Sequence, residues 1–173
     1  MSKIFSLLEI KSEIDRLADL IGAPNNLLPT YGHSIDSAHP HIEVDSRGYH
    51  YIVRERGQET SRETTAELDE LLYHVFKHIT FSLACKYELS RRIEGQDFRR
   101  LLFRYQVALL SMISPEWAKR EAREHERILQ IYPYDDLAIA RVELAKTLKE
   151  QGLSPEAAWV RACEKYPLPE SNR

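Results

Sequence analysis

Residues 39–57 read HPHIEVDSRGYHYIVRERG, and this stretch decides the fold. Ile42 and Val44 alternate with polar residues up to DSRG at 45–48, whose composition is typical of a type I turn closed by a glycine at positive φ. After the turn the alternation resumes with aromatic and β-branched residues, which favour half-buried strands, at Tyr49, Tyr51 and Val53. The stretch therefore predicts a β-hairpin over residues 41–55.

The polar residues of this hairpin raise the question of a metal site, because His39, His41 and His50 lie close to Glu43 and Asp45 in the sequence. Imidazole and carboxylate groups are common zinc ligands. However, residues two apart on one strand lie about 7 Å apart, which is about twice the separation of adjacent zinc ligands. We therefore predict outward-facing strand residues, and a small metal-dependent hydrolase that uses this histidine-rich hairpin is the alternative.

Two strands alone are marginally stable, so the hairpin needs other elements to cover it. Upstream, apolar residues recur at helical spacing through residues 4–21, and Gly22 followed by Pro24 ends the pattern. This predicts an amphipathic helix. The connection after the helix is rich in Pro, Gly, Asn and Ser, and its residues 30–34 are a candidate third strand.

The longest predicted helix follows the hairpin, from Thr64 or Thr65 to Arg92. Its apolar residues have the spacing of one helical face: Leu68, Leu71, Leu72, Val75, Ile79 and Leu83. Gly95 ends this helix, and Asp97 is suited to cap a second core helix with a similar apolar stripe. Together these elements predict an α+β fold, with a small antiparallel sheet covered by long helices.

Further helices are predicted in the C-terminal part of the chain. Ser-Pro-Glu occurs at 114–116 and again at 154–156, and in each copy serine caps, proline fits the first turn and glutamate complements the helix dipole. Between them, Asp135 or Asp136 is predicted to begin a helix that Gly152 ends. We predict one domain, 1–173, with an α+β core over 1–132 and a helical extension over 133–173 packed on that core.

Composition restricts the class of protein. With 173 residues, 43% of them hydrophobic, the chain is long enough to bury one core, and a net charge of −3 gives no strong field towards nucleic acid or an anionic membrane. No apolar run reaches the roughly 18 residues that a membrane-spanning helix needs. The two cysteines are too few for a disulfide framework, so we expect reduced thiols in a cytoplasmic protein.

Other candidate sites have structural interpretations that we favour. Acidic residues alternate with an arginine cluster near the two core helices, so intramolecular pairing explains it better than nucleic-acid binding, the weaker alternative. Its members are Arg91, Arg92, Arg99, Arg100 and Arg104. His74 and His78 have the spacing of a zinc-binding helix but lack its glutamate, and Cys85 is expected to be a buried thiol. We therefore predict no catalytic residue, cofactor or metal site.

Four blocks, in this order and spacing, carry a resemblance to a known family. They are IGAPNNLLPTYG at 21–32, PHIEVDSRGYHYIVRERG at 40–57, ELDELLYHVFKHITFSLACKYELSRR at 67–92, and QDFRRLLFRYQVALL at 96–110, with Trp117 following. The chain resembles the immunity protein 63 family of bacterial polymorphic toxin systems over residues 1–132.

The resemblance implies a cytoplasmic antidote that binds and neutralises a cognate polymorphic or contact-dependent toxin domain, without catalysis. It implies a protein partner and no nucleic-acid or membrane partner, and it leaves the oligomeric state open. We hypothesise that acidic and aromatic residues clustered beside the turn and the long connection lie in or near the toxin-contacting surface. These residues are Tyr31, Glu43, Asp45, Tyr49 and Glu55.

Overall fold

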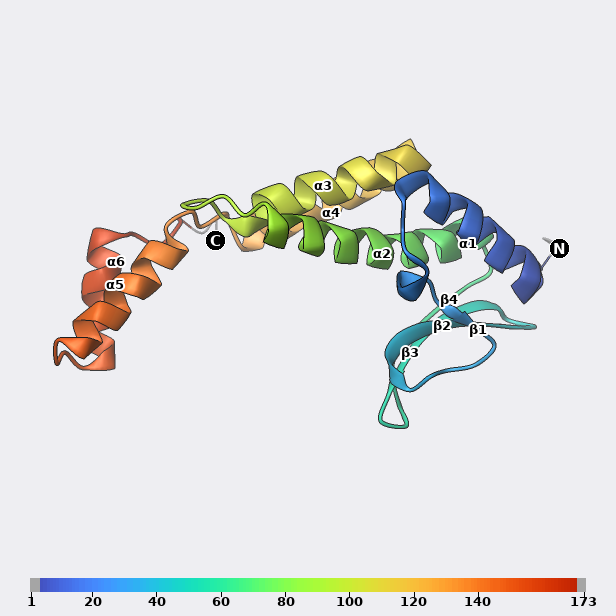
Figure 1. The fold of residues 1–173 in the computed structure, drawn as a ribbon, viewed down its shortest axis with the longest axis horizontal. Helices are drawn as coiled ribbons and strands as arrows, with labels where there is room; N and C mark the ends of the chain where they lie inside the picture. The colour runs from blue at the N-terminus through green and yellow to red at the C-terminus, as the bar shows by residue number, and fades with distance from the viewer. Residues whose placement is uncertain (1–3, 171–173) are drawn as a thin grey trace. The chain divides into compact units, whose positions relative to one another are not determined.

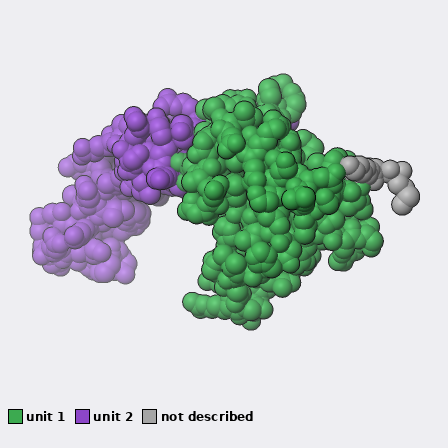
Figure 2. All heavy atoms as spheres, turned by 45° about the vertical axis from the view of Figure 1, so that its right-hand side comes forward, with its two compact units in different colours: residues 1–83, 106–119 green, residues 84–105, 120–173 purple. Residues whose placement is uncertain are grey.

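The computed structural model describes residues 4–170 and divides the chain into two compact units (Figure 2). The first unit comprises residues 1–83 and 106–119, and the second comprises 84–105 and 120–173. Each change of unit falls inside a helix. The predicted boundary at residue 133 lies within the second unit, and the behaviour of the chain as one domain stays a prediction.

The first unit begins with the predicted N-terminal helix, α1 (Leu7–Ile21). Its start is fixed by a reciprocal pair of hydrogen bonds, in which the Ser6 hydroxyl accepts from the Glu9 amide and the Glu9 carboxylate accepts from the Ser6 amide. Gly22 ends the helix in the left-handed conformation at φ 63°, and a short 3-10 turn, η1 (Asn25–Leu27), follows. The helix prediction is confirmed.

A four-stranded mixed sheet follows, in the order β1-β2-β3-β4 (Figure 1). Its strands are β1 (Thr30–Tyr31), β2 (Ser37–Asp45), β3 (Gly48–Glu55) and β4 (Gln58–Thr65). β1 pairs with β2 in parallel, and the other pairs are antiparallel. The predicted hairpin and the candidate third strand are both confirmed, and so is the α+β class.

The fourth strand was not predicted, and the prediction that Thr64 or Thr65 begins the long helix was wrong. The sequence of β4, QETSRETT, has no apolar alternation, and its residues are exposed from Gln58 to Thr64. The strand instead follows from a two-residue turn in which Arg56 and Gly57 both have positive φ, 53° and 75°. Such turns match the twist of an antiparallel pair and therefore return the chain alongside β3.

Gly48, at the end of the β2–β3 turn, is required by space as well as by conformation. It has φ 123°, and a Cβ atom at this position would lie 2.3 Å from the carbonyl oxygen of Thr65 in β4. Only glycine therefore allows β4 to approach the turn so closely.

The core of the first unit lies between the sheet and the helices that cover one of its faces (Figure 1). Three long helices contribute to the fold: α2 (Leu68–Ser90), α3 (Phe98–Ile113) and α4 (Pro115–Ile131). Sheet residues Ile42, Tyr49 and Tyr51 share one cluster with α1 and α2 residues that include Ile10, Ile14, Leu71, Val75 and Phe76. Each fully buried side chain of this size contributes about 1.5–3 kcal/mol.

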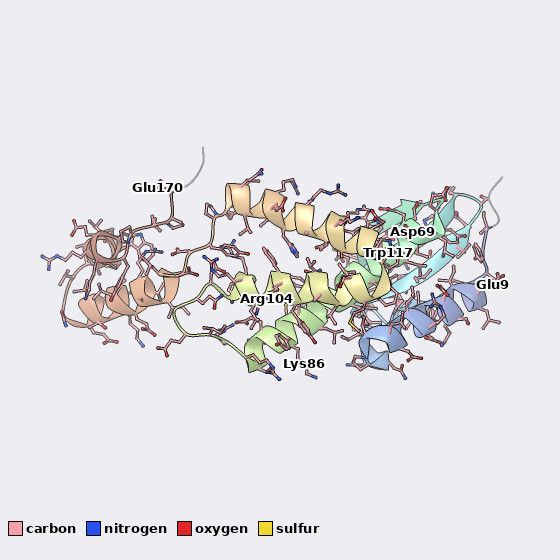
Figure 3. All side chains as sticks on the ribbon, turned by 90° about the horizontal axis from the view of Figure 1, so that it is seen from above. Glu9, Asp69, Lys86, Arg104, Trp117 and Glu170 are labelled. Carbon is pink, nitrogen blue, oxygen red and sulfur yellow. The ribbon has the colours of Figure 1, made fainter. Side chains whose placement is uncertain are left out.

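Trp117 of α4 completes this core. Its ring lies 6.2 Å from that of Phe76, nearly parallel at 21°, and its indole N–H donates to the Asp69 carboxylate at 3.2 Å (Figure 3). Ser114 caps α4 as predicted, because its hydroxyl accepts from the Trp117 amide. The Ser114 cap therefore also fixes the backbone of Trp117, the residue that completes the core.

The second unit contains the helical hairpin of α5 (Ala138–Glu150) and α6 (Pro155–Lys165). Ser154 caps α6 as predicted, accepting from the Ala157 amide at 3.2 Å. The two helices bury alanines, namely Ala145, Ala158 and Ala162. Small side chains at these positions allow the two backbones to approach closely.

Polar residues at the start of α3, in the connection before α5 and in α5 itself form a network, which we call the Asp97–Arg141 network. Asp97 accepts from the Arg99 side chain and the Asp135 amide, while Asp136 accepts from the Asp97 amide and from Arg100. Arg141 donates to Asp135 and to the carbonyls of Tyr166 and Pro167. The prediction that Asp135 or Asp136 begins α5 was wrong, because both carboxylates face this network and α5 begins without a side-chain cap.

The same contacts account for much of the predicted arginine cluster. Arg92 pairs with Glu88 at 2.8 Å, Arg99 with Asp97 at 2.6 Å and Arg100 with Asp136 at 2.9 Å. Arg91 lies over the Tyr87 ring, 5.1 Å from its centre. Intramolecular contacts therefore use these cations, as the sequence interpretation expected. In the part of the chain that the structure describes, no helix has the length and apolar character needed to cross a bilayer.

Candidate protein-binding surface

The strand alternation gives the sheet two chemically different faces. Ile42, Tyr49 and Tyr51 point into the core, whereas Ile52 is fully buried and yet lies outside the core cluster. Register places His41 and Arg62 on either side of Ile52, and Glu43 and Thr64 on either side of His50. We call the face opposite the helices the outer face, and its residues are His41, Glu43, Asp45, His50, Ile52, Arg62 and Thr64.

Two histidines of the outer face are buried, with His41 0% and His50 1% exposed. His50 Nδ1 lies 2.9 Å from the Thr64 hydroxyl, and its Nε2 lies 2.9 Å from Asp45 Oδ1 without the alignment of a hydrogen bond. His41 Nε2 lies 3.2 Å from Glu43 Oε1, while its Nδ1 has no hydrogen-bond partner among the described residues. Both histidines lie on the outward face, as predicted, but adjacent strands and their long side chains enclose the two rings.

Ion pairs cover these buried groups. Arg62 donates to Glu59 at 2.7 Å and lies 3.9 Å from Glu43, and Arg47 pairs with Asp45 at 2.8 Å. The hydrogen bond from Arg47, followed by the close approach of the His50 ring, holds the pKa of Asp45 well below its usual range. Ion pairs as exposed to solvent as these stabilise a fold only weakly. They can therefore be exchanged for pairs with another protein at small cost.

The structure separates the five residues that we hypothesised as contacts. Glu43 and Asp45 lie on the outer face, whereas Glu55 pairs with Ser37 at the opposite end of the hairpin. Tyr49 is 1% exposed, and its hydroxyl accepts from the Phe5 amide at 2.9 Å. Tyr31 pairs in register with Ile42, so it belongs to the core side of the sheet. Only Glu43 and Asp45 therefore share one accessible surface, and Tyr49 lies inside the core.

The end of the sheet near Glu55 has an unusual backbone that the sequence analysis missed. Asp36, Ala38 and Arg56 all have left-handed φ values between 53° and 57°. The Asp36 carboxylate accepts from the Gly57 amide at 2.8 Å, which fastens the loop before β2 to the β3–β4 turn. Each such residue is strained by about 1–2 kcal/mol, so this end of the sheet is held in one conformation by its contacts. Ile35, in the same loop, is 53% exposed.

The structure does not gather the histidines into a metal site. Among residues 4–170, no group of three or more His, Cys, Asp or Glu side chains is arranged to hold a metal ion. His33 and His39 contact the carbonyls of Tyr31 and Leu28, respectively. This geometry lends no support to the alternative of a metal-dependent hydrolase.

His74 and His78, which lie four residues apart on α2, have different partners. His74 pairs with Glu70 at 3.1 Å, and His78 packs edge-on against the Tyr51 ring, so His78 is the one that faces the sheet. Burial, with His39 nearby, lowers the pKa of His78. Burial likewise raises the pKa of the Cys85 thiol, which disfavours the reactive thiolate.

Comparison with family models gives one match, to the model described as Immunity protein 63, over residues 45–127. Over this stretch the chain is similar to the immunity protein 63 family. The resemblance expected from the sequence is therefore confirmed for the region from the β2–β3 turn into α4. Comparison with the curated proteins and with the solved structures gave no match.

The immunity protein 63 region contains β3, β4, α2 and α3 and most of α4. It includes Asp45, His50, Ile52, Arg62 and Thr64 of the outer face, whereas His41 and Glu43 come just before it. The α5–α6 hairpin lies after it. The family match thus covers both the outer face of two strands and the helices behind them.

Proposed function

We propose that this chain is an immunity protein that binds a cognate polymorphic or contact-dependent toxin domain and neutralises it in the cytoplasm. The observation that carries the proposal is the immunity protein 63 match over residues 45–127. The role needs no catalytic step by this chain, only a surface of fixed shape and charge that fits the toxin.

The outer face of the sheet is the contact surface that we propose. A sheet backed by a packed core presents its side chains with little loss of conformational freedom on binding. Its carboxylates Glu43 and Asp45 are paired only with partly exposed cations or with histidines, so they remain able to meet basic groups on a partner. Complementary charge of this kind speeds association and selects among partners.

The test is a binding assay between the full chain and the toxin domain encoded beside its gene. Charge reversal of the outer face, Glu43→Lys with Asp45→Lys, is expected to weaken binding about tenfold or more. A matched control, Glu13→Lys with Glu116→Lys, also breaks two exposed ion pairs but lies on helices, and it should change binding less than about twofold.

Two results would refute parts of the proposal. If neighbouring toxin domains do not bind the chain at all, the immunity function is rejected. If binding occurs and the outer-face variant binds as tightly as the wild type, the function stands and the surface is rejected. Glu55→Lys, at the other end of the hairpin, then tests whether the strained loop and turn form the contact instead.

A further inference from the structure

The two edges of the sheet differ in length and in cover. β1 forms one edge and consists only of Thr30 and Tyr31, so it is too short to receive a further strand. β4 forms the other edge with eight residues, and β3 is the only strand that pairs with it in the described range 4–170. The residues from Gln58 to Thr64 are all exposed. The sheet can therefore be extended at β4 and not at β1.

The free side of β4 carries backbone groups that no other described strand uses. In an antiparallel pair, successive residues direct their N–H and C=O groups alternately toward the neighbouring strand and away from it. The Thr65 carbonyl points toward β3, because its oxygen would lie 2.3 Å from a Cβ atom on Gly48. The N–H and C=O groups of Arg62 and Thr64 therefore point away from β3, toward the free edge. The register shift of this pair lies nearer the β3–β4 turn, so residues 61–65 form a regular strand.

Little in the sequence of β4 prevents pairing at this edge. Natural edge strands are often protected by proline, by lysine or by bulges, and QETSRETT contains neither proline nor lysine. Its threonines favour extended backbone. Two charged residues lie in the regular part of the strand, Arg62 on the outer face and Glu63 on the opposite face. They do not block every strand, but they select which strand fits.

These charges disfavour a second copy of the same strand. If two β4 strands paired antiparallel with Arg62 opposite Arg62, two cations would meet. The next register that keeps the free backbone groups facing each other pairs Arg62 with Thr64, and it places Glu63 opposite Glu63. Like charges directly opposite each other destabilise a sheet. A strand from another protein, with an acidic residue opposite Arg62 and a basic residue opposite Glu63, has neither conflict.

We propose that the toxin domain adds an antiparallel strand to β4, which pairs with residues 61–65 and carries these two charges. The inference rests on the immunity function proposed above and names how the partner is held. Arg62 and Thr64 belong to the outer face, so the added strand would extend that face by one strand. Main-chain hydrogen bonds give such a complex its affinity, and alternate side chains give it specificity. All of β4 lies within the region that matches the family model.

Amide hydrogen exchange on the full chain, free and bound to the toxin domain encoded beside its gene, tests the proposal. In the free chain the amides of Arg62 and Thr64 should exchange fast, whereas that of Glu63, which points toward β3, should be protected. On binding, exchange at Arg62 and Thr64 should slow about tenfold or more, because the added strand accepts both hydrogen bonds. A complex that leaves both amides as fast as in the free chain overturns the proposal, while the immunity function stands.

Thr64→Pro tests the same contact through affinity. Proline is tolerated in an edge strand where its nitrogen faces away from the neighbouring strand, so pairing with β3 is kept and only the donor to an added strand is lost. We expect toxin binding to weaken about tenfold. Thr64→Val, the matched control, loses the same hydroxyl contact with His50 but keeps the N–H, and it should bind within about twofold of the wild type. Equal affinities of the two variants, with the Glu63 amide protected in both, overturn the proposal; if Thr64→Pro loses that protection, exchange in the wild-type complex decides.

Two peptides test the charge selection without the toxin. In antiparallel pairing, acetyl-Thr-Val-Lys-Glu-Val-Thr-amide places lysine opposite Glu63 and glutamate opposite Arg62, and its control exchanges these two peptide residues. NMR titration of the full chain should show about threefold tighter binding of the first peptide, with shifts centred on the amides of Arg62 and Thr64. If the toxin domain does not bind, the immunity function is rejected and the peptides decide whether the edge accepts a strand. Equal binding of the two peptides, or no shift at these amides, overturns the proposal.

Discussion

The two compact units bury different kinds of side chains. The core of the first unit consists of large aliphatic and aromatic residues, such as Ile10, Ile42, Leu71 and Phe76. The second unit buries alanines and the two leucines Leu101 and Leu102, together with a larger set of charged or titratable groups, namely Glu88, Asp97, Glu121, His125 and Arg141. Stability in the first unit therefore depends mainly on apolar area, and stability in the second depends more on directional polar contacts.

This difference has consequences for how each unit responds to change. An apolar core tolerates many substitutions that conserve volume, because its contacts are numerous and not directional. A buried polar network must satisfy every member, and it fails when one partner is removed. The second unit should therefore be the more sensitive to single polar substitutions and to acid, and the first to loss of volume.

The largest effect is expected from Phe76→Ala in the first unit. Phe76 is fully buried and stacks on Trp117, so its truncation leaves a cavity and should reduce the free energy of unfolding by about 3–5 kcal/mol. Chemical denaturation measures this loss, and amide hydrogen exchange in β2 and β3 locates it. Phe81→Ala on the same helix, at a side chain 46% exposed, is the control and should cost far less.

Equal losses for Phe81→Ala and Phe76→Ala would contradict the assignment of the core. If the loss of hydrogen-exchange protection instead centred on α5 and α6, the distinction between the two units would fail.

Arg141→Met tests whether the second unit depends on its polar network. Arg141 is 2% exposed and donates to the Tyr166 and Pro167 carbonyls, both at 2.7 Å. Methionine keeps apolar volume but leaves these acceptors and Asp135 without a donor, so the second unit should lose about 2–4 kcal/mol. Hydrogen exchange should report this loss in α5 and α6 and leave β2 and β3 protected.

Arg161→Met, at an exposed arginine of α6, is the matched control and should be nearly neutral. The network has no stabilising role if Arg141→Met is also neutral in denaturant unfolding and in exchange.

The sequence was sufficient for elements whose apolar residues repeat with a clear period. The stripe from Leu68 to Leu83 predicted α2, and the alternation around residues 45–48 predicted β2 and β3. It was insufficient for β4, whose residues carry no apolar pattern and whose pairing is set by the turn at Arg56 and Gly57. A strand of this kind is specified by its neighbour and leaves no signal of its own.

The candidate site was predictable in residue type and not in placement. The sequence identified the polar residues of the hairpin, and Glu43 and Asp45 do share the outer face. The burial of His41 and His50 depends on Arg62 and Thr64 from the unpredicted strand, so period-two reasoning gave the correct face but the wrong exposure. Asp135 and Asp136 likewise have partners about 40 residues away in the sequence, and capping rules that use only neighbouring residues do not predict such partners.

Acid should affect the second unit through Asp97. Burial alone would raise the pKa of Asp97, but hydrogen bonds from Arg99 and from the backbone amides of Asp135 and Arg99 hold it below its usual value. A carboxyl group whose pKa is lowered by folding stabilises the protein fully above the unfolded pKa of about 3.9, and this contribution is lost progressively as pH falls from that value through the lower pKa of the folded state. Protection of α5 and α6 should therefore decline below about pH 4.

Asp97→Asn should cost about 1–2 kcal/mol at neutral pH and should flatten this decline, because the titrating group is absent. Glu156→Gln, at an exposed carboxylate of α6, should leave the acid dependence as in the wild type. An unchanged acid limb in Asp97→Asn would assign the acid sensitivity to other carboxylates.

The smallest effect concerns a single polar bond at the border of the apolar core. Asp69→Ala removes the hydrogen-bond acceptor of the indole N–H of Trp117, a residue that is 5% exposed. The same substitution also removes a carboxylate from the first turn of α2. The difference between the cost of Asp69→Ala in the wild type and its cost in a Trp117→Phe background isolates the indole bond, because phenylalanine has no N–H donor. We expect a difference of about 1 kcal/mol in denaturant unfolding. A difference near zero would mean that apolar contacts alone hold Trp117, whereas a loss as large as that of Phe76→Ala would mean that the first unit also depends on directional bonds.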